Sequence, residues 1–295
     1  MCMIAVAAFV IASPVYGQKK NKNKKSTEKT AETTVKAPSG YKLVYNYQAG
    51  NPVSYSSVSK IIQSMDINGE TMQSTVDIVL SCLVTGGGKD GDNLKLDVKI
   101  DTLSQKVESP MGSNGGIISD VAGKSFSMIL SPAGKELDLK DAEKLTYTVE
   151  GSMPTDISQS FNDFFPDMPD RVINPGETWT STDSTKSKAA SLSMKQVVTS
   201  NNKFEGIVNM DGYECAKITA TTSGTREQSG ETQGMDILVK GTFTGTYEVY
   251  FAVKEGFVVR EISTSKLTGT LDISGMQNMS MPLTADMTSK KFIKK

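Results

Sequence analysis

The chain has 295 residues, with 32 Lys and Arg against 33 Asp and Glu, and 37% of its residues are hydrophobic. This balance excludes a disordered polyelectrolyte and supplies enough apolar side chains for a folded core. The sequence contains no histidine, which excludes His-based triads, imidazole general bases and HExxH zinc sites within the chain. The sequence also contains no motif typical of a catalytic nucleophile, a metal site or a cofactor site. We therefore expect a non-catalytic protein without a cofactor or a metal.

The first segment has the character of an export signal. Met3 to Ala12 form an apolar run that is well short of the about 20 residues needed to span a bilayer as a helix. No Lys or Arg precedes the run, but Val15, Tyr16 and Gly17 suit a cleavage site. Residues 1–17 are therefore predicted to be a signal peptide, with a buried first strand or helix as the alternative. We expect an exported protein, periplasmic or extracellular, without a transmembrane segment in the mature chain.

Residues 18–40 are polar throughout, with seven Lys and two Glu, and show no apolar periodicity. This composition predicts a disordered tether, because nothing in it offsets the entropy cost of ordering. This Lys-rich segment is either a solvated spacer or a segment that is attracted to an anionic surface. No aromatic residue or Arg is interleaved with them, so nucleic acid is not an expected partner.

From Tyr41 onward the chain alternates apolar and polar residues with period two, which is typical of antiparallel strands. Hairpin turns are predicted at Asn68-Gly69, in the Gly-rich stretch 86–93, at Asn201-Asn202 and at Asp211-Gly212. The fold is predicted to be mainly β: two curved antiparallel sheets, built as tandem meanders like half-barrels, joined by a short helix. The boundaries are an N-terminal meander at 41–150, a helical connector at 151–177 and a C-terminal meander at 178–290.

The connector contains the clearest helical pattern. Thr155 or Asp156 can cap its start, Ile157, Phe161 and Phe164 fall at i, i+4 and i+7, and Pro166 ends it. Asp163, Asp167 and Asp170 follow in the same segment. Such carboxylates could pair as acid and base, which keeps a His-free carboxylate hydrolase as a minor alternative.

The two cysteines of the predicted mature chain, Cys82 and Cys215, both occupy alternating strand segments. An exported chain meets an oxidising environment, where a single disulfide between them is one alternative. Two free, buried thiols are the other, because nothing in the sequence fixes their separation.

One stretch supports a resemblance to a known group. The SFSMILSPAGKE hairpin, the Phe-rich helix and FPDMPDRVINPGETW at 165–179 lie between two meanders, after a leader and a polar tether. In this order the chain resembles an uncharacterised family of exported β-rich proteins common in Bacteroidetes-type bacteria. The resemblance implies export and β architecture and supplies no chemistry.

Alternation places several large apolar side chains on inward strand faces in both meanders. If two such sheets face each other without meeting fully, the gap favours a lipid-like or other hydrophobic ligand. We therefore predict a binding or carrier-type protein, with a structural or protein-interaction module of the cell envelope as the alternative. The predicted apolar lining of the site is Met128, Leu130, Val249, Phe251, Met279 and Met281.

Overall fold

A computed structural model describes residues 40–67, 69–149, 154–189, 192–232, 235–275 and 278–294. The predicted signal peptide and all but the last residue of the predicted tether lie outside this range, as does Asn68. Within the described ranges, no helix has both the length and the apolar character needed to cross a membrane.

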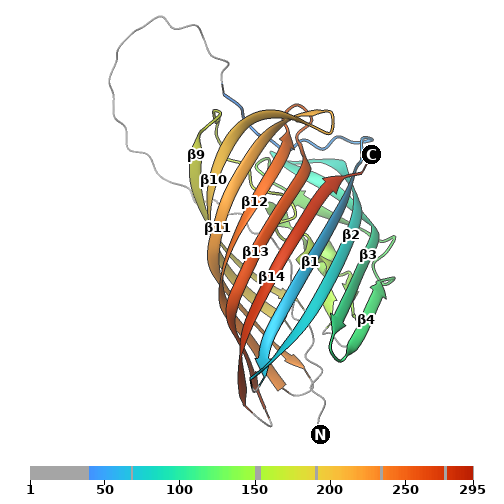
Figure 1. Cartoon of the computed structure of the whole chain (residues 1–295). Coiled ribbons are helices and arrows are strands. Elements are labelled where there is room, and N and C mark those ends of the chain that lie inside the picture. Colours follow the sequence, from blue (N-terminus) through green and yellow to red (C-terminus); the bar gives the residue numbers. More distant parts are fainter. Residues whose placement is uncertain are drawn as a thin grey trace, which may run out of the picture.

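The N-terminal half forms six strands, one short helix and part of a second, two-stranded sheet (Figure 1). These elements are β1 (Val53–Ile67), β2 (Glu70–Asp90), β3 (Asn93–Ser109), β4 (Gly112–Ile117), β5 (Ser125–Leu130), β6 (Glu136–Asp138), α1 (Lys140–Glu143) and β7 (Thr146–Tyr147).

The connector and the C-terminal half contribute one 3₁₀ turn and the longest run of strands. Their elements are β8 (Thr155–Asp156), η1 (Ile157–Ser160), β9 (Thr178–Ala189), β10 (Leu192–Met210), β11 (Tyr213–Thr232), β12 (Met235–Ala252), β13 (Phe257–Ser274) and β14 (Met279–Ile293).

The prediction of a mainly β, antiparallel fold is confirmed, but the two meanders form one sheet instead of two. The strand order in this 12-stranded sheet is β6-β5-β3-β2-β1-β14-β13-β12-β11-β10-β9, with β4 also paired to β3. The meanders join where β1 pairs antiparallel with β14, for example Ser59 opposite Ser289. Each meander alone would leave a long unpaired edge strand, and the pairing of the two edges satisfies both rows of backbone groups. The sheet stays open between β6 and β9 and curls around its inner face (Figure 1).

Two of the predicted hairpin signals behave as expected. Asp211 and Gly212 both have positive φ, 53° and 93°, as a two-residue turn of the I′ type requires. Gly69 has a φ of 85° between β1 and β2. In the Gly-rich stretch the turn forms only at its far end, because β2 continues to Asp90 with a bulge between Gly86 and Gly88.

The predicted turn at Asn201-Asn202 is wrong. Both residues lie inside β10, which runs without a break from Leu192 to Met210. The buried Asn202 amide donates to the Ser181 hydroxyl at 3.3 Å, so the side chain is satisfied inside the sheet. Tertiary partners thus outweigh the turn preference of an Asn pair.

The predicted helix of the connector is much shorter than its pattern suggests. Within the described part of the connector, 154–177, only the 3₁₀ turn η1 forms, and the Asp156 carboxylate accepts from the Ser158 backbone N–H as the predicted cap. The chain then takes a left-handed conformation at Asp163, with a φ of 62°, which ends helical geometry before Pro166.

Glycines on the inner face accompany the strong curvature of the sheet. A Cβ at Gly224 of β11 would lie 2.8 Å from the ring of Phe243, and one at Gly245 of β12 would lie 2.9 Å from the Thr222 hydroxyl. Such positions let neighbouring strands and an aromatic ring approach the backbone closely. The absence of side chains here permits the tight bend of the C-terminal strands.

The inner face carries two separate apolar cores at opposite ends of the strands. The larger one lies at the end of the sheet that the connector fills, and we call it the plug-end cluster. It includes Tyr55, Met128, Phe161, Phe204 and Phe251. The smaller one, the tip cluster, lies at the far ends of β1, β12, β13 and β14, and consists of Met65, Ile237, Val239, Leu271, Ile273, Met281 and Leu283. The inner face between the two cores mixes polar side chains, such as Ser263 and Arg226, with apolar ones, such as Phe243 and Met287.

Trp179, the single tryptophan, lies on the edge strand β9 and is half-buried against the plug-end cluster. A fully buried Trp replaced with Ala costs about 3 to 5 kcal/mol, so the half-buried ring should contribute about 2 kcal/mol. We expect Trp179→Ala to lower the free energy of unfolding by that amount, and Trp179→Phe by about half as much. Urea denaturation measures both, and equal midpoints for all three proteins would contradict this packing.

Candidate functional site

One end of the curved sheet is filled by the connector, residues 154–175, which we call the plug. Its aromatic side chains point into the plug-end cluster, where Phe161 lies 4.9 Å from Phe126 and Phe164 lies 5.6 Å from Tyr55, both as edge contacts between ring centroids. Phe165 packs edge-on to Tyr45 at 5.8 Å. Aromatic edge contacts of this kind add to the free energy of burial. The Phe-rich pattern of the connector thus serves packing.

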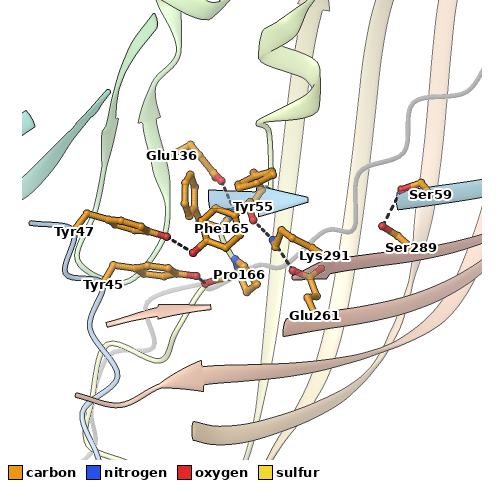
Figure 2. Close-up of polar contacts among 11 residues, drawn as sticks. Tyr45, Tyr47, Tyr55, Ser59, Glu136, Phe165, Pro166, Glu261, Ser289 and Lys291 are labelled. Carbon is orange, nitrogen blue, oxygen red and sulfur yellow. Dashed lines mark hydrogen bonds and ion pairs between the residues drawn. The ribbon is translucent and has the colours of Figure 1, made fainter. Parts of the chain in front are cut away.

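A buried ion pair holds the plug against the last two strands (Figure 2). Lys291 of β14 and Glu261 of β13 lie 2.6 Å apart, with only 7% and 4% of their side-chain surfaces exposed. The Lys291 ammonium also donates to the backbone carbonyl of Phe164 and lies 4.5 Å from the centre of its ring. A buried ammonium is tolerated only when its donors are used in this way. Lys291 therefore ties the plug to the sheet.

Further hydrogen bonds fix the backbone of the plug (Figure 2). The Tyr45 hydroxyl donates to the carbonyl of Pro166 at 2.9 Å, and the Glu136 carboxylate accepts from the Phe165 N–H at 3.0 Å. Tyr47 and Tyr55 share a hydroxyl hydrogen bond of 2.7 Å beside them. Three separate parts of the chain thus satisfy the polar backbone of the plug.

The predicted acidic cluster is partly assembled at the plug. Burial, together with the negative charge of Asp167, raises the pKa of Asp163 well above its usual range. Burial and then the charge of Asp183 raise the pKa of Asp167 to about 7. Burial and then the charge of Asp163 also raise the pKa of Glu136, which the sequence did not single out. Asp170 is exposed. Among the described residues, no three His, Cys, Asp or Glu side chains are arranged to hold a metal ion.

Between the plug and the tip cluster, the inner face forms a hollow. It is lined by inward-facing side chains of β11 to β14: Thr222, Arg226, Phe243, Tyr247, Ser263, Ser265, Leu267 and Met287, together with Thr246 and Thr264. Its empty volume is about 480 Å³, which includes open solvent at the mouth, and the space open to the centres of water molecules is about 40 Å³. This space takes about three water molecules.

One buried polar group that lacks a partner lines this hollow, and others lie elsewhere on the inner face of the sheet. The Ser263 hydroxyl lines it, and its residue is only 5% exposed. In the described part of the chain, five inward-facing polar atoms have no hydrogen-bond partner: Gln63 Oε1, Gln196 Nε2, Ser200 Oγ, Gln228 Nε2 and Ser263 Oγ. Buried polar atoms are nearly always satisfied, by protein, water or a ligand. The buried Ser263 hydroxyl in the wall of the hollow is therefore a point at which water or a ligand can bind.

The six predicted lining residues do not lie at the hollow. Met128, Leu130, Val249 and Phe251 are buried in the plug-end cluster. Met281 belongs to the tip cluster and Met279 packs against it. Alternation predicted their inward orientation correctly, but the plug and the curl of the sheet cover them with other side chains.

Cys82 and Cys215 are both buried, free thiols. Cys82 lies in the plug-end cluster, whereas Cys215 packs with Tyr250, Ala252 and Val259 in a third cluster. Ala216 belongs to the plug-end cluster, so alternation puts its neighbour Cys215 on the opposite face of β11. Burial raises the pKa of each thiol to about 12.

The sequence reasoning overlooked Arg226, Gln196 and Ser263. The sequence did contain a signal for Arg226. The even-numbered residues Ile218 and Ala220 of β11 are buried on the inner face, and alternation puts Arg226 on that same face. A charged residue at an inward position of a strand marks a site or an ion pair. Gln196 and Ser263 carried no comparable signal among many polar strand residues.

No protein-family model matches this chain, and no curated protein matches it. Solved structures with some likeness include OccK2 (OpdF) of Pseudomonas aeruginosa, 6% identical, covering 86% of this chain and 99% of that chain with a TM-score of 0.25. OccK11 (OpdR) of the same organism is 8% identical, covering 87% and 100% with a TM-score of 0.20. A DUF1329 family protein from Desulfovibrio piger is 10% identical, covering 79% and 83% with a TM-score of 0.13. These TM-scores are too low for an argument about function, and the family resemblance inferred from sequence stays a prediction.

Proposed function

We propose that the chain is an exported, non-catalytic binding or carrier-type protein that holds a small ligand in the hollow of its curved sheet. The observation that carries the proposal is the Ser263 hydroxyl, buried without a partner in the wall of an open hollow. Removing a polar group from water without replacing its hydrogen bonds costs about 1 to 3 kcal/mol, which a ligand or water can offset. The rigid plug and the continuous sheet hold this wall in place without the ligand.

The wall of the hollow suits a ligand that has both polar and apolar parts. Thr222, Arg226 and Ser263 supply polar groups, whereas Phe243, Leu267 and Met287 supply apolar surface. This differs from the purely apolar gap expected from the sequence, because the apolar cores are closed by packing at both ends. A small number of polar groups in a mostly pre-formed concave site is the usual design of ligand pockets.

Export and a periplasmic or extracellular location remain part of the proposal. They rest on the apolar run Met3 to Ala12 and the cleavage-site residues before Gln18. N-terminal sequencing of the protein recovered from the producing cell should give Gln18 as the first residue.

A cavity-filling substitution tests the binding role directly. Ser265 lines the hollow opposite Gly245, so the ring of Ser265→Phe should occupy the ligand space by packing over the glycine. Thr268→Phe, at an exposed position of the same strand, is the matched control. Native mass spectrometry of the parent and the control should show a bound small molecule that is released on unfolding, and Ser265→Phe should lack it. An empty parent protein that binds no amphiphilic probe would reject the binding role and favour the envelope-interaction alternative.

A further inference from the structure

We propose that the hollow binds an uncharged amphiphile whose head group carries free hydroxyls, with the head against Ser263 and Thr222 and the apolar tail over Phe243 and Leu267. This inference rests on the proposed function and deepens it by naming the class of ligand.

The register of the strands orders the wall of the hollow from polar to apolar. Three neighbouring rows of inward-facing residues cross β11, β12, β13 and β14, and successive rows lie about 7 Å apart along the strands. From the plug toward the tip, the rows are Ala220, Tyr247, Ser263 and Ser289; Thr222, Gly245, Ser265 and Met287; and Gly224, Phe243, Leu267 and Ala285. Hydroxyls thus gather on the plug side and large apolar side chains on the tip side. An amphiphile fits this wall in one direction, with its head toward the plug.

The polar end of the wall has an unused hydroxyl. Ser263 is only 5% exposed, and its Oγ has no hydrogen-bond partner among the described residues. The two neighbours of Ser263 in its row do have partners: Tyr247 donates to the Asn202 amide oxygen, and Ser289 accepts from the Ser59 hydroxyl at 2.8 Å (Figure 2). A hydroxyl group both donates and accepts, so its best complement is a ligand group that does the same. A ligand hydroxyl meets this requirement.

The charges around the hollow disfavour an ionised head group. Arg226 lines the hollow beyond the row of Phe243, on the tip side, where its Nε donates to the Gln196 amide oxygen at 2.5 Å and its Cζ lies 5.9 Å from the centre of the Phe243 ring. On the plug side, the next inward position of β13 is Glu261, which is paired with Lys291 at 2.6 Å. These charged groups are engaged by the protein itself. An ionised head at the hydroxyl end would lose its hydration without gaining a cation or an anion of its own, whereas an uncharged head avoids this cost.

The size of the hollow suits a head group with more than one hydroxyl. The space open to the centres of water molecules, about 40 Å³, takes about three of them. A ligand that displaces ordered water keeps its affinity only when its own groups reproduce the hydrogen bonds of that water. The hydroxyls of a glycerol head can replace such waters at Ser263, Ser265 and Thr222, whereas an ester or an alkyl group alone cannot.

The tip side of the hollow provides the surface for the tail. Phe243 lies opposite Leu267 in the register, and both line the hollow. Leu267 also packs against the tip cluster, so the apolar surface continues in that direction. Met287 lies between the polar and the apolar end, and its thioether can adjust to tails of different shape.

Calorimetry with matched probes tests this inference. 1-Monooctanoylglycerol should bind the parent protein at least tenfold more tightly than octanoate, which has a similar tail and an ionised head. It should also bind at least tenfold more tightly than methyl octanoate, which has the tail but no hydroxyl. Glycerol, which has the hydroxyls without the tail, should show no measurable binding.

Two variants test the hydroxyl end separately. Ser263→Ala and Thr222→Val each remove one hydroxyl and should weaken the binding of 1-monooctanoylglycerol at least threefold, while the binding of methyl octanoate stays unchanged. Ser263→Ala removes a hydroxyl without a partner, so its melting temperature should equal or exceed that of the parent. Ser274→Ala, at an exposed position of β13, is the matched control and should bind 1-monooctanoylglycerol as the parent does.

The outcomes separate this inference from the proposed function. Binding of octanoate as tight as that of 1-monooctanoylglycerol, or undiminished binding of 1-monooctanoylglycerol by both hydroxyl variants, would overturn the uncharged, hydroxylated head. In that case a ligand carried by the parent but not by Ser265→Phe would leave the proposed function standing. Failure of the parent to bind any probe or carry any ligand would reject both.

Discussion

Replacing Lys291 with alanine should lower the free energy of unfolding by about 3 to 5 kcal/mol, the usual cost of removing one member of a buried ion pair. The substitution leaves the Glu261 carboxylate buried at 4% side-chain exposure and removes the donor to the Phe164 carbonyl. Both losses fall on the contact between the plug and the sheet. Urea denaturation followed by far-UV circular dichroism measures the effect.

Two controls separate this effect from a general loss of a lysine. Lys290→Ala removes the exposed neighbour on the same strand and should change stability by less than about 0.5 kcal/mol. The double variant Lys291→Met with Glu261→Leu removes both buried charges and should recover most of the loss, because apolar pairs of similar volume replace buried ion pairs well. Similar midpoints for Lys291→Ala and Lys290→Ala would show that the pair does not hold the plug.

The protein should become less stable as the pH rises from about 4 to about 8. Burial raises the pKa of Asp167 to about 7 in the folded protein, whereas an unfolded Asp titrates near 3.9. Between these values the folded protein keeps a proton that the unfolded chain releases, so stability is full below the unfolded pKa and falls up to the folded one. At 1.36 kcal/mol per unit, the loss from this group is up to about 4 kcal/mol. The raised pKa values of Glu136 and Asp163 act in the same direction.

Asp167→Asn isolates the contribution of this carboxyl group. The variant should be more stable than the parent at pH 8, similar to it at pH 4, and show a flatter dependence on pH between them. Asp170→Asn changes an exposed carboxylate on the same segment and is the matched control. Stability of the parent that rises from pH 4 to pH 8 would contradict the burial of the acidic cluster.

The local part of the fold was accessible from the sequence, because alternation and turn chemistry act over a few residues. The inward orientation of Phe251 and Met281 follows from period two, and the Asp211-Gly212 turn follows from the positive φ that both positions adopt. The pairing of β1 with β14 was not accessible, since Ser59 and Ser289 are 230 positions apart and no local pattern records their contact.

The candidate site shows the same limit. The even register of β11 could have identified Arg226 as inward-facing, but its neighbours Phe243, Ser263 and Met287 come from three other strands. The predicted lining residues Met128 and Phe251 lie in a packed core with residues that are distant in sequence, such as Phe161 of the plug. Side chains on an inward face lie in a closed core or in a cavity according to what covers them, which alternation does not specify.

Methyl NMR of the methionines tests the central claim, that the hollow between the plug and the tip is the ligand site. Met287 lines the hollow, whereas Met128 is buried in the plug-end cluster, and Met287→Leu assigns the resonance of interest. On addition of the molecule released from the native protein, the Met287 methyl should shift to saturation while the Met128 methyl stays in place. A ligand that shifts Met128 and leaves Met287 unchanged would place binding outside the hollow and contradict the account.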